Sequence, residues 1–182
     1  MTETKDAAPR VYLSPLVEAD VDDRYLSWFD DTDSIKYYSG SGRRFDRESV
    51  VSELVRGRES GETFIYGIRL IESDHLIGTI KIGPIDHRNE TSDLVVHIGE
   101  RPNVGKGLAS EAISLGNQIA FTDHGIRKLF GGMYAANEGA VRAYQNAGWV
   151  VEGRLRDHYL VDGQPMDRIL VACFKYEPKD HD

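Results

Sequence analysis

The stretch Val104–Ala112, which reads VGKGLASEA, constrains the fold of this chain more than any other. Gly105 and Gly107 flank Lys106 and open directly into a segment whose apolar residues recur with the spacing of an amphipathic helix. The apolar run at 94–99, LVVHIG, predicts a buried strand just before the glycines. A strand, a glycine loop and a helix N-terminus in this order bring N–H groups and the positive end of the helix dipole to one spot. This arrangement favours binding of a phosphate group.

Three phosphate-binding patterns compete for this stretch. A nucleotide P-loop requires G-x-x-x-x-G-K-[ST], which fails because Lys106 stands between the two glycines. A dinucleotide fingerprint requires G-x-G-x-x-G or A, and Ser110 occupies its last place. The pattern [QR]-x-x-G-x-[GA] binds the pyrophosphate of coenzyme A. Gly107 and Ala109 match its second half, whereas Val104 replaces the usual Gln or Arg. A tight turn without any ligand also explains the glycine pair.

Length and composition limit the class of protein. A chain of 182 residues, 40% hydrophobic and 29% charged, fits one globular domain with its own core. A net charge of −8 without a block of Lys and Arg argues against nucleic acid as the main partner. The sequence shows no apolar run of membrane-spanning length, no signal-peptide pattern and a single cysteine, Cys173. These features predict a cytoplasmic protein that does not bind membranes.

Periodicity predicts a mixed order of elements. The strands are expected at 11–16, 63–71, 75–82, 93–99, 128–134, 149–155 and 167–175, and the helices at 18–29, 47–58, 108–124 and 138–146. Asp46 and Asn137 are expected to cap helices, and Gly83-Pro84 to end a strand. This order predicts an α+β fold in which residues 10–176 form a single domain, preceded by a disordered lead-in at 1–9 and followed by a tail at 177–182.

The most specific motif is NEGAVRAYQNAGW at 137–149, which matches N-x-x-[AS]-x-x-x-Y-x-x-x-G-[FW]. With the glycine loop in the right order and separation, this motif makes the chain resemble the GNAT superfamily of N-acetyltransferases. Further matches at Trp28, at Ile98-Gly99-Glu100 and at 152–156 make it similar to the branch that contains ribosomal-protein alanine, spermidine and nucleotide-amino-sugar N-acetyltransferases. The resemblance extends over nearly the whole chain.

The resemblance implies a mostly antiparallel sheet of six to seven strands, flanked by about four helices. Two parallel strands, 94–99 and 128–134, are expected to splay apart and to hold the pantetheine arm of acetyl-CoA, the co-substrate, between them; no metal is implied. The residues expected to bind the cofactor are His97, Ile98, Gly99, Val104, Gly105, Lys106, Gly107, Leu108, Ala109, Ser110, Asn137, Ala140 and Tyr144.

Acetyl transfer from a thioester to an amine requires a deprotonated amine and a protonated leaving thiolate. By resemblance Tyr144, with a reference pKa of about 10, is the general acid. A purely structural interpretation makes Tyr144 a core aromatic residue and Asn137 only a helix cap. Glu100 is the first candidate for the general base, His97 is the second, and a chain of water molecules would also serve. Solvent exposure of Glu100 and a half-buried place for His97 explain these two residues equally well.

The acceptor is expected to be a primary amine of a small molecule, either a polyamine or a nucleotide-linked amino sugar. An acetyltransferase for protein N-termini is the alternative, and a non-catalytic acyl-CoA-binding module is the alternative of another class. A longer acyl donor and a homodimer also remain open. Acidic residues would suit a polyamine, whereas arginines would suit a phosphate or an acidic peptide. The residues concerned are Asp30, Asp31, Asp33, Tyr37, Tyr38, Arg43, Arg44, His158 and Tyr159.

Overall fold

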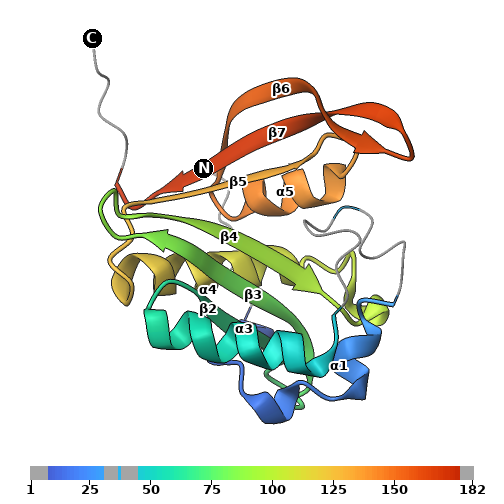
Figure 1. Ribbon diagram of the computed structural model, residues 1–182, viewed down its shortest axis with the longest axis vertical. Helices are drawn as coiled ribbons and strands as arrows, with labels where there is room; N and C mark the ends of the chain where they lie inside the picture. Colours follow the sequence, from blue (N-terminus) through green and yellow to red (C-terminus); the bar gives the residue numbers. More distant parts are fainter. Residues whose placement is uncertain (1–7, 31–36, 38–44, 177–182) are drawn as a thin grey trace.

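A seven-stranded sheet with the strand order β1-β2-β3-β4-β5-β7-β6 runs through the computed structural model of the protein (Figure 1). The structure describes residues 8–30, 37 and 45–176. Within these residues β4 and β5 are parallel, and all other neighbouring strands are antiparallel. The predicted α+β fold is confirmed. The predictions for residues 1–7 and 177–182 lie outside the described residues.

The strands and the longer helices follow one another along the chain in the predicted order, whereas the predicted helix at 18–29 is divided in two and η2, at 101–103, was not predicted. The elements are β1 (Val11–Pro15), η1 (Glu18–Asp20), α1 (Asp23–Ser27), α3 (Arg47–Ser60), β2 (Phe64–Leu70), β3 (Leu76–Asp86), β4 (Thr91–Ile98), η2 (Arg101–Asn103), α4 (Leu108–Thr122), β5 (Lys128–Tyr134), α5 (Glu138–Asn146), β6 (Val150–Val161) and β7 (Gln164–Phe174).

Two predicted helix caps are confirmed. The Asp46 carboxylate accepts a hydrogen bond from the backbone N–H of Ser49 at 2.8 Å and starts α3. The Asn137 side chain accepts one from the N–H of Ala140 at 3.2 Å and starts α5. Each cap satisfies an N–H group that has no partner within its own helix, which is why these side chains fix the helix starts so well.

The helix predicted at 18–29 is wrong as a single helix, because the structure divides it into η1 and α1. Two aspartates explain the division. Asp20 accepts a hydrogen bond from the N–H of Val17 at 3.0 Å, and Asp22 accepts one from the N–H of Tyr25 at 2.8 Å. Short acidic side chains compete with the helical carbonyls for backbone N–H groups, so Asp22 ends one turn and caps the next.

Two strand limits also differ from the prediction. Gly83-Pro84 does not end β3, because an irregularity between Ile82 and Ile85 absorbs the two residues and pairing resumes up to Asp86. The β6–β7 hairpin is longer than expected, because the two strands extend to a two-residue turn at Asp162-Gly163, whereas the prediction left residues 156–166 between them. Both turn residues have positive φ, 51° and 76°, as a tight hairpin requires.

Helices cover both faces of the sheet (Figure 1). On one face α4 and α5 pack on β3, β4 and β5, and a Cβ added at Gly116 of α4 would lie 3.1 Å from side-chain atoms of Ile80 and Leu94. On the other face α1 and α3 enclose a smaller cluster that includes Trp28 and Phe29. These two layers hold β4 from both sides. No described helix combines the length and the apolar character needed to cross a membrane.

Candidate active site

The parallel strands β4 and β5 form a fork. They pair from Thr91 and Lys128 only as far as Asp93 and Phe130, although both strands continue beyond that point. The splayed strands predicted from the sequence are therefore present. The separated edge of β4 lies beside the loop that leads into α4, and a cavity of about 800 Å³ opens there.

The cavity is lined by the end of β4, the loop before α4, the first turn of α4 and one side of α5, together with Tyr37. Its predicted lining residues are His97, Ile98, Val104, Gly105, Gly107, Leu108, Ala109, Ser110, Asn137 and Ala140. Residues that sequence reasoning missed are Val96, Arg101, Asn103, Gly139, Arg142, Ala143 and Asn146. Of the described residues predicted to bind the cofactor or to take part in catalysis, Gly99, Glu100, Lys106 and Tyr144 do not line this cavity.

The loop before α4 suits an anion. Gly105 and Gly107 adopt φ values of 77° and 80°, which L side chains rarely adopt. Gly107 is the N-cap of α4 and has no side chain to occupy the N–H groups of the first helical turn. Arg101 and Arg142 add positive charge to the cavity wall. These residues fit the pyrophosphate of coenzyme A.

Tyr144 of α5 lies on the face of the sheet that α4 and α5 cover, and its hydroxyl contacts β4 where β4 and β5 separate. Its hydroxyl donates a hydrogen bond of 2.7 Å to the carbonyl of Leu94, the residue directly after the last β4–β5 pair. The ring packs edge-on against Trp149 at 4.8 Å, and the Trp149 indole N–H donates to Asn117 at 3.0 Å. This buried arrangement fixes the Tyr144 hydroxyl at the fork.

His97 lies on the opposite face of β4, between Trp28 and Phe29, with ring centroids 6.3 and 5.2 Å away. The residue is 7% exposed. Burial disfavours the charged imidazolium and lowers the pKa of His97 to about 4. The ring is therefore neutral at pH 7, while the residue contributes to the cavity wall.

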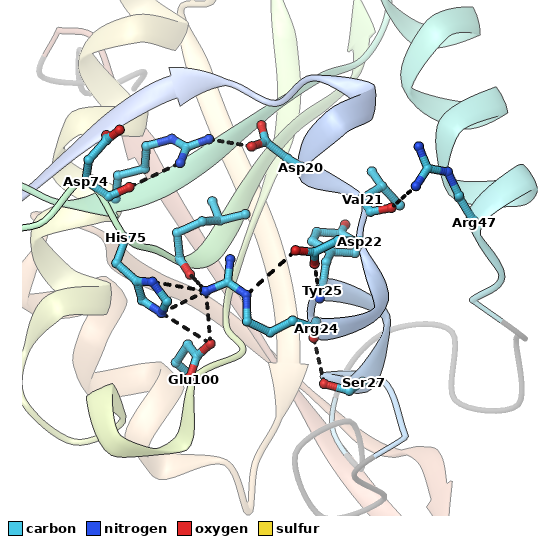
Figure 2. A network of polar contacts seen from close by, with 12 residues as sticks. Asp20, Val21, Asp22, Arg24, Tyr25, Ser27, Arg47, Asp74, His75 and Glu100 are labelled. Atoms are coloured by element: carbon cyan, nitrogen blue, oxygen red, sulfur yellow. Dashed lines mark hydrogen bonds and ion pairs between the residues drawn. The ribbon is translucent and has the colours of Figure 1, made fainter.

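Glu100 takes part in a polar network (Figure 2) and does not line the cavity. Its Oε1 atom lies 3.5 Å from Arg24 Nη1 and 3.5 Å from His75 Nε2. Arg24 also donates to the carbonyl of Leu76 at 3.3 Å. This network joins α1, the start of β3 and the end of β4.

Gly99 serves Trp28. A Cβ at Gly99 would overlap the Trp28 indole, and the Gly99 N–H donates to the carbonyl of Ile77 at 2.9 Å. We expect Gly99→Ala to lower the free energy of unfolding by about 1–3 kcal/mol, the range for overpacking. Gly153→Ala is the control, because its Cβ would make an ordinary contact of 3.7 Å with Leu170. Urea unfolding measures both variants, and equal stabilities would contradict the role of Gly99.

Asp93, the last residue of β4 that pairs with β5, was missed by sequence reasoning. Burial raises the pKa of its carboxyl to about 6, although the positive charges of Lys81 and Arg168 oppose this rise. Gly131 leaves room beside it, since a Cβ there would lie 3.5 Å from Asp93 Oδ1. An acidic residue directly before the apolar run Leu94–Val96 of β4 was the available signal.

Three tyrosines pack against one another beside the fork and form what we call the tyrosine cluster: Tyr37, Tyr134 and Tyr159. Tyr134 lies 4.0 Å from Tyr159 and 5.4 Å from Tyr37 between ring centroids, and the Arg168 guanidinium lies 5.6 Å from the centre of the Tyr159 ring. His158 is 3.5 Å from Arg168. The structure thus brings together three predicted acceptor residues and adds Tyr134 and Arg168. The acceptor predictions for Asp31, Asp33, Tyr38, Arg43 and Arg44 lie outside the described residues.

Known proteins share this sequence pattern and fold. The sequence matches the profile of the acetyltransferase (GNAT) domain over residues 10–150. It is 24% identical over 171 residues to the probable N-acetyltransferase YjcK of Bacillus subtilis, which covers 89% of this chain and 92% of that protein. It is 28% identical over 100 residues to the spermidine N(1)-acetyltransferase of Escherichia coli, which covers 55% of this chain and 53% of that enzyme.

The fold is also shared with a solved structure, the spermidine N-acetyltransferase from Vibrio cholerae in complex with CoA and spermine. The TM-score is 0.80 at 17% identity, over 91% of this chain and 96% of that chain. At this identity the likeness concerns the fold. The domain match over most of the sequence shows that this chain belongs to the GNAT family of N-acetyltransferases, enzymes that use acetyl-CoA as co-substrate.

Proposed function

We propose that the chain transfers an acetyl group directly to the primary amine of a small molecule, with both substrates bound at the fork. The supporting observation is that Asp93 and Tyr144 lie on opposite faces of β4, at the point where β4 and β5 separate. Successive strand residues point to opposite faces, and Tyr144 contacts the backbone of Leu94, next to Asp93, from the side of α5. The amine and the leaving thiolate would therefore find separate proton-transfer groups.

The end of β4 and the loop would hold acetyl-CoA. Backbone groups of Val96, His97 and Ile98 lie beyond the last pairing with β5, so an extended pantetheine arm would pair with this edge like an added strand. The N–H groups around Gly107 would bind the pyrophosphate. Bound in this way, acetyl-CoA supplies a thioester carbonyl at the base of the fork.

Asp93 is our candidate for the general base and Tyr144 for the general acid. A carboxyl with a pKa of about 6 is ionised at pH 7 and is a stronger base than an ordinary carboxylate. His97, with a pKa of about 4, is a weaker base. Glu100 stays a prediction, and its ion pair with Arg24 at 3.5 Å makes us rank it below Asp93.

The acceptor site would be the tyrosine cluster beside Asp93. Aromatic faces and a carboxylate suit an ammonium group, whereas Arg168 suits an additional anionic group on the acceptor. Polyamines and nucleotide-linked amino sugars are both small amines of the proposed class. The cytoplasmic location and the homodimer remain predictions from sequence and family.

The test is acetyl transfer by the purified protein to a panel of amines, followed by mass spectrometry of each acceptor. The panel contains spermidine, a nucleotide-linked amino sugar, and short peptides with free N-terminal Ala or Ser. We expect acetylation of one small amine. Acetylation of a peptide N-terminus alone would make the chain a protein acetyltransferase. Coenzyme A binding without any product would favour a binding module.

A further inference from the structure

Arg10 joins the start of β1 to the loop before α4. Its backbone N–H donates to Glu111 Oε2 at 3.1 Å, and its Nε donates to Glu111 Oε1 at 2.6 Å. Its Nη2 is ion-paired with the same carboxylate. Its Nη1 donates to the carbonyl oxygen of Lys106 at 3.0 Å, and its own carbonyl accepts from the N–H of Ile71 at 2.9 Å. The side chain is thus fixed at its base and at its tip.

The bond to Lys106 fixes one peptide group of the loop. In a trans peptide the carbonyl and the following N–H point in opposite directions. Since Arg10 holds the Lys106 carbonyl on its own side, the N–H of Gly107 faces the other way, and Gly107 itself lines the cavity. The freedom of φ at Gly107 would otherwise let this peptide turn at little cost.

The same contacts neutralise a negative charge next to the loop. Glu111 lies in the first turn of α4, where an unpaired carboxylate would repel an incoming anion. Arg10 neutralises it with several charge-assisted hydrogen bonds. The guanidinium also lies directly behind the loop, because a Cβ at Gly107 would be 3.4 Å from Arg10 Nη2.

We propose that Arg10, anchored by Glu111, is a positioning residue that holds the Lys106–Gly107 peptide in the orientation that binds the pyrophosphate of coenzyme A. Arg10 acts through the loop rather than by touching the cofactor. This inference rests on the proposed function, because it takes the loop as the pyrophosphate site.

Comparing the binding of two ligands, one with and one without the pyrophosphate, distinguishes a positioning role of Arg10 from a general effect on folding. Coenzyme A binding is measured by calorimetry, and pantetheine, which lacks the pyrophosphate, is titrated by NMR. We expect Arg10→Met to weaken coenzyme A binding by about 10- to 100-fold, the loss typical of one charged hydrogen bond, and to leave pantetheine binding unchanged. Glu111→Gln should give a smaller loss of the same kind, and Arg10→Lys should restore part of the affinity.

Lys128→Met is the matched control, because it breaks the ion pair with Glu152 at 2.7 Å, which joins β5 to β6. It should keep the affinity of the unchanged protein for both ligands. Equal coenzyme A affinity in Arg10→Met, or an equal loss for coenzyme A and pantetheine, would overturn the positioning role. A wild-type protein that binds no coenzyme A would instead refute the proposed function, which the variants alone cannot do.

Discussion

Replacing Tyr144 by phenylalanine is expected to lower kcat by about 10²- to 10⁴-fold, the range for loss of a general acid. The KM for acetyl-CoA should change little, because the ring and its packing on Trp149 at 4.8 Å remain. The variant should also lose about 1–3 kcal/mol of stability, since the buried Leu94 carbonyl loses its 2.7 Å hydrogen bond. Steady-state kinetics and urea unfolding measure the two effects separately.

Tyr66→Phe is the control for this substitution. It also removes a tyrosine hydroxyl, one that lies 2.9 Å from His124 Nε2 on a half-buried strand away from the fork. Tyr66→Phe should have the same kcat as the wild-type protein. If Tyr144→Phe also keeps that kcat, Tyr144 is a core aromatic residue that caps a backbone carbonyl, and another group protonates the thiolate.

Asp93→Asn is expected to lower kcat/KM by about 10²-fold or more and to make the protein more stable at pH 7. Burial raises the folded-state pKa of Asp93 from 3.8 to about 6. The folded protein therefore binds a proton more tightly than the unfolded chain, and wild-type stability falls as the pH rises from about 4 to about 6. Asparagine avoids this cost, which is at most about 3 kcal/mol for a shift of this size.

The pH profile tests the same residue. The kcat/KM of the unchanged protein should rise with pH through about 6, as Asp93 loses its proton. If Asp93→Asn keeps this rise and Glu100→Gln loses it, Glu100 is the base.

Asp167→Asn is a control for the effect of Asp93→Asn on stability, and its expected effect has the opposite sign. Hydrogen bonds from the N–H of Asp157 and from Arg154 lower the pKa of Asp167, so asparagine there should reduce stability at pH 7.

The parts of the molecule that sequence could predict are those determined locally. Asp46 and Asn137 fix helix starts within three residues, and the loop at 104–107 lies next to its own helix in the chain. The alternation of apolar and polar residues predicted where the strands lie. The splayed pair of strands was predictable because the resemblance rests on two contiguous motifs.

The remaining features depend on contacts between distant segments. The ion pair of Glu100 with Arg24 requires α1 to pack beside the end of β4, and no local pattern specifies it. The strand order places β7 between β5 and β6, and this brings Arg168 to Tyr159 and within electrostatic reach of Asp93. The chain order of the strands alone does not give this neighbourhood, so the candidate base was missed.

The most direct test of the central claim is a crystal structure of the protein with coenzyme A. We expect the pantetheine arm to lie along β4 beyond Asp93, with the pyrophosphate at Gly107 and the sulfur within about 3.5 Å of the Tyr144 hydroxyl, near enough for proton transfer. A cofactor bound outside the β4–β5 fork, or a sulfur on the far side of β4 from Tyr144, would contradict this claim.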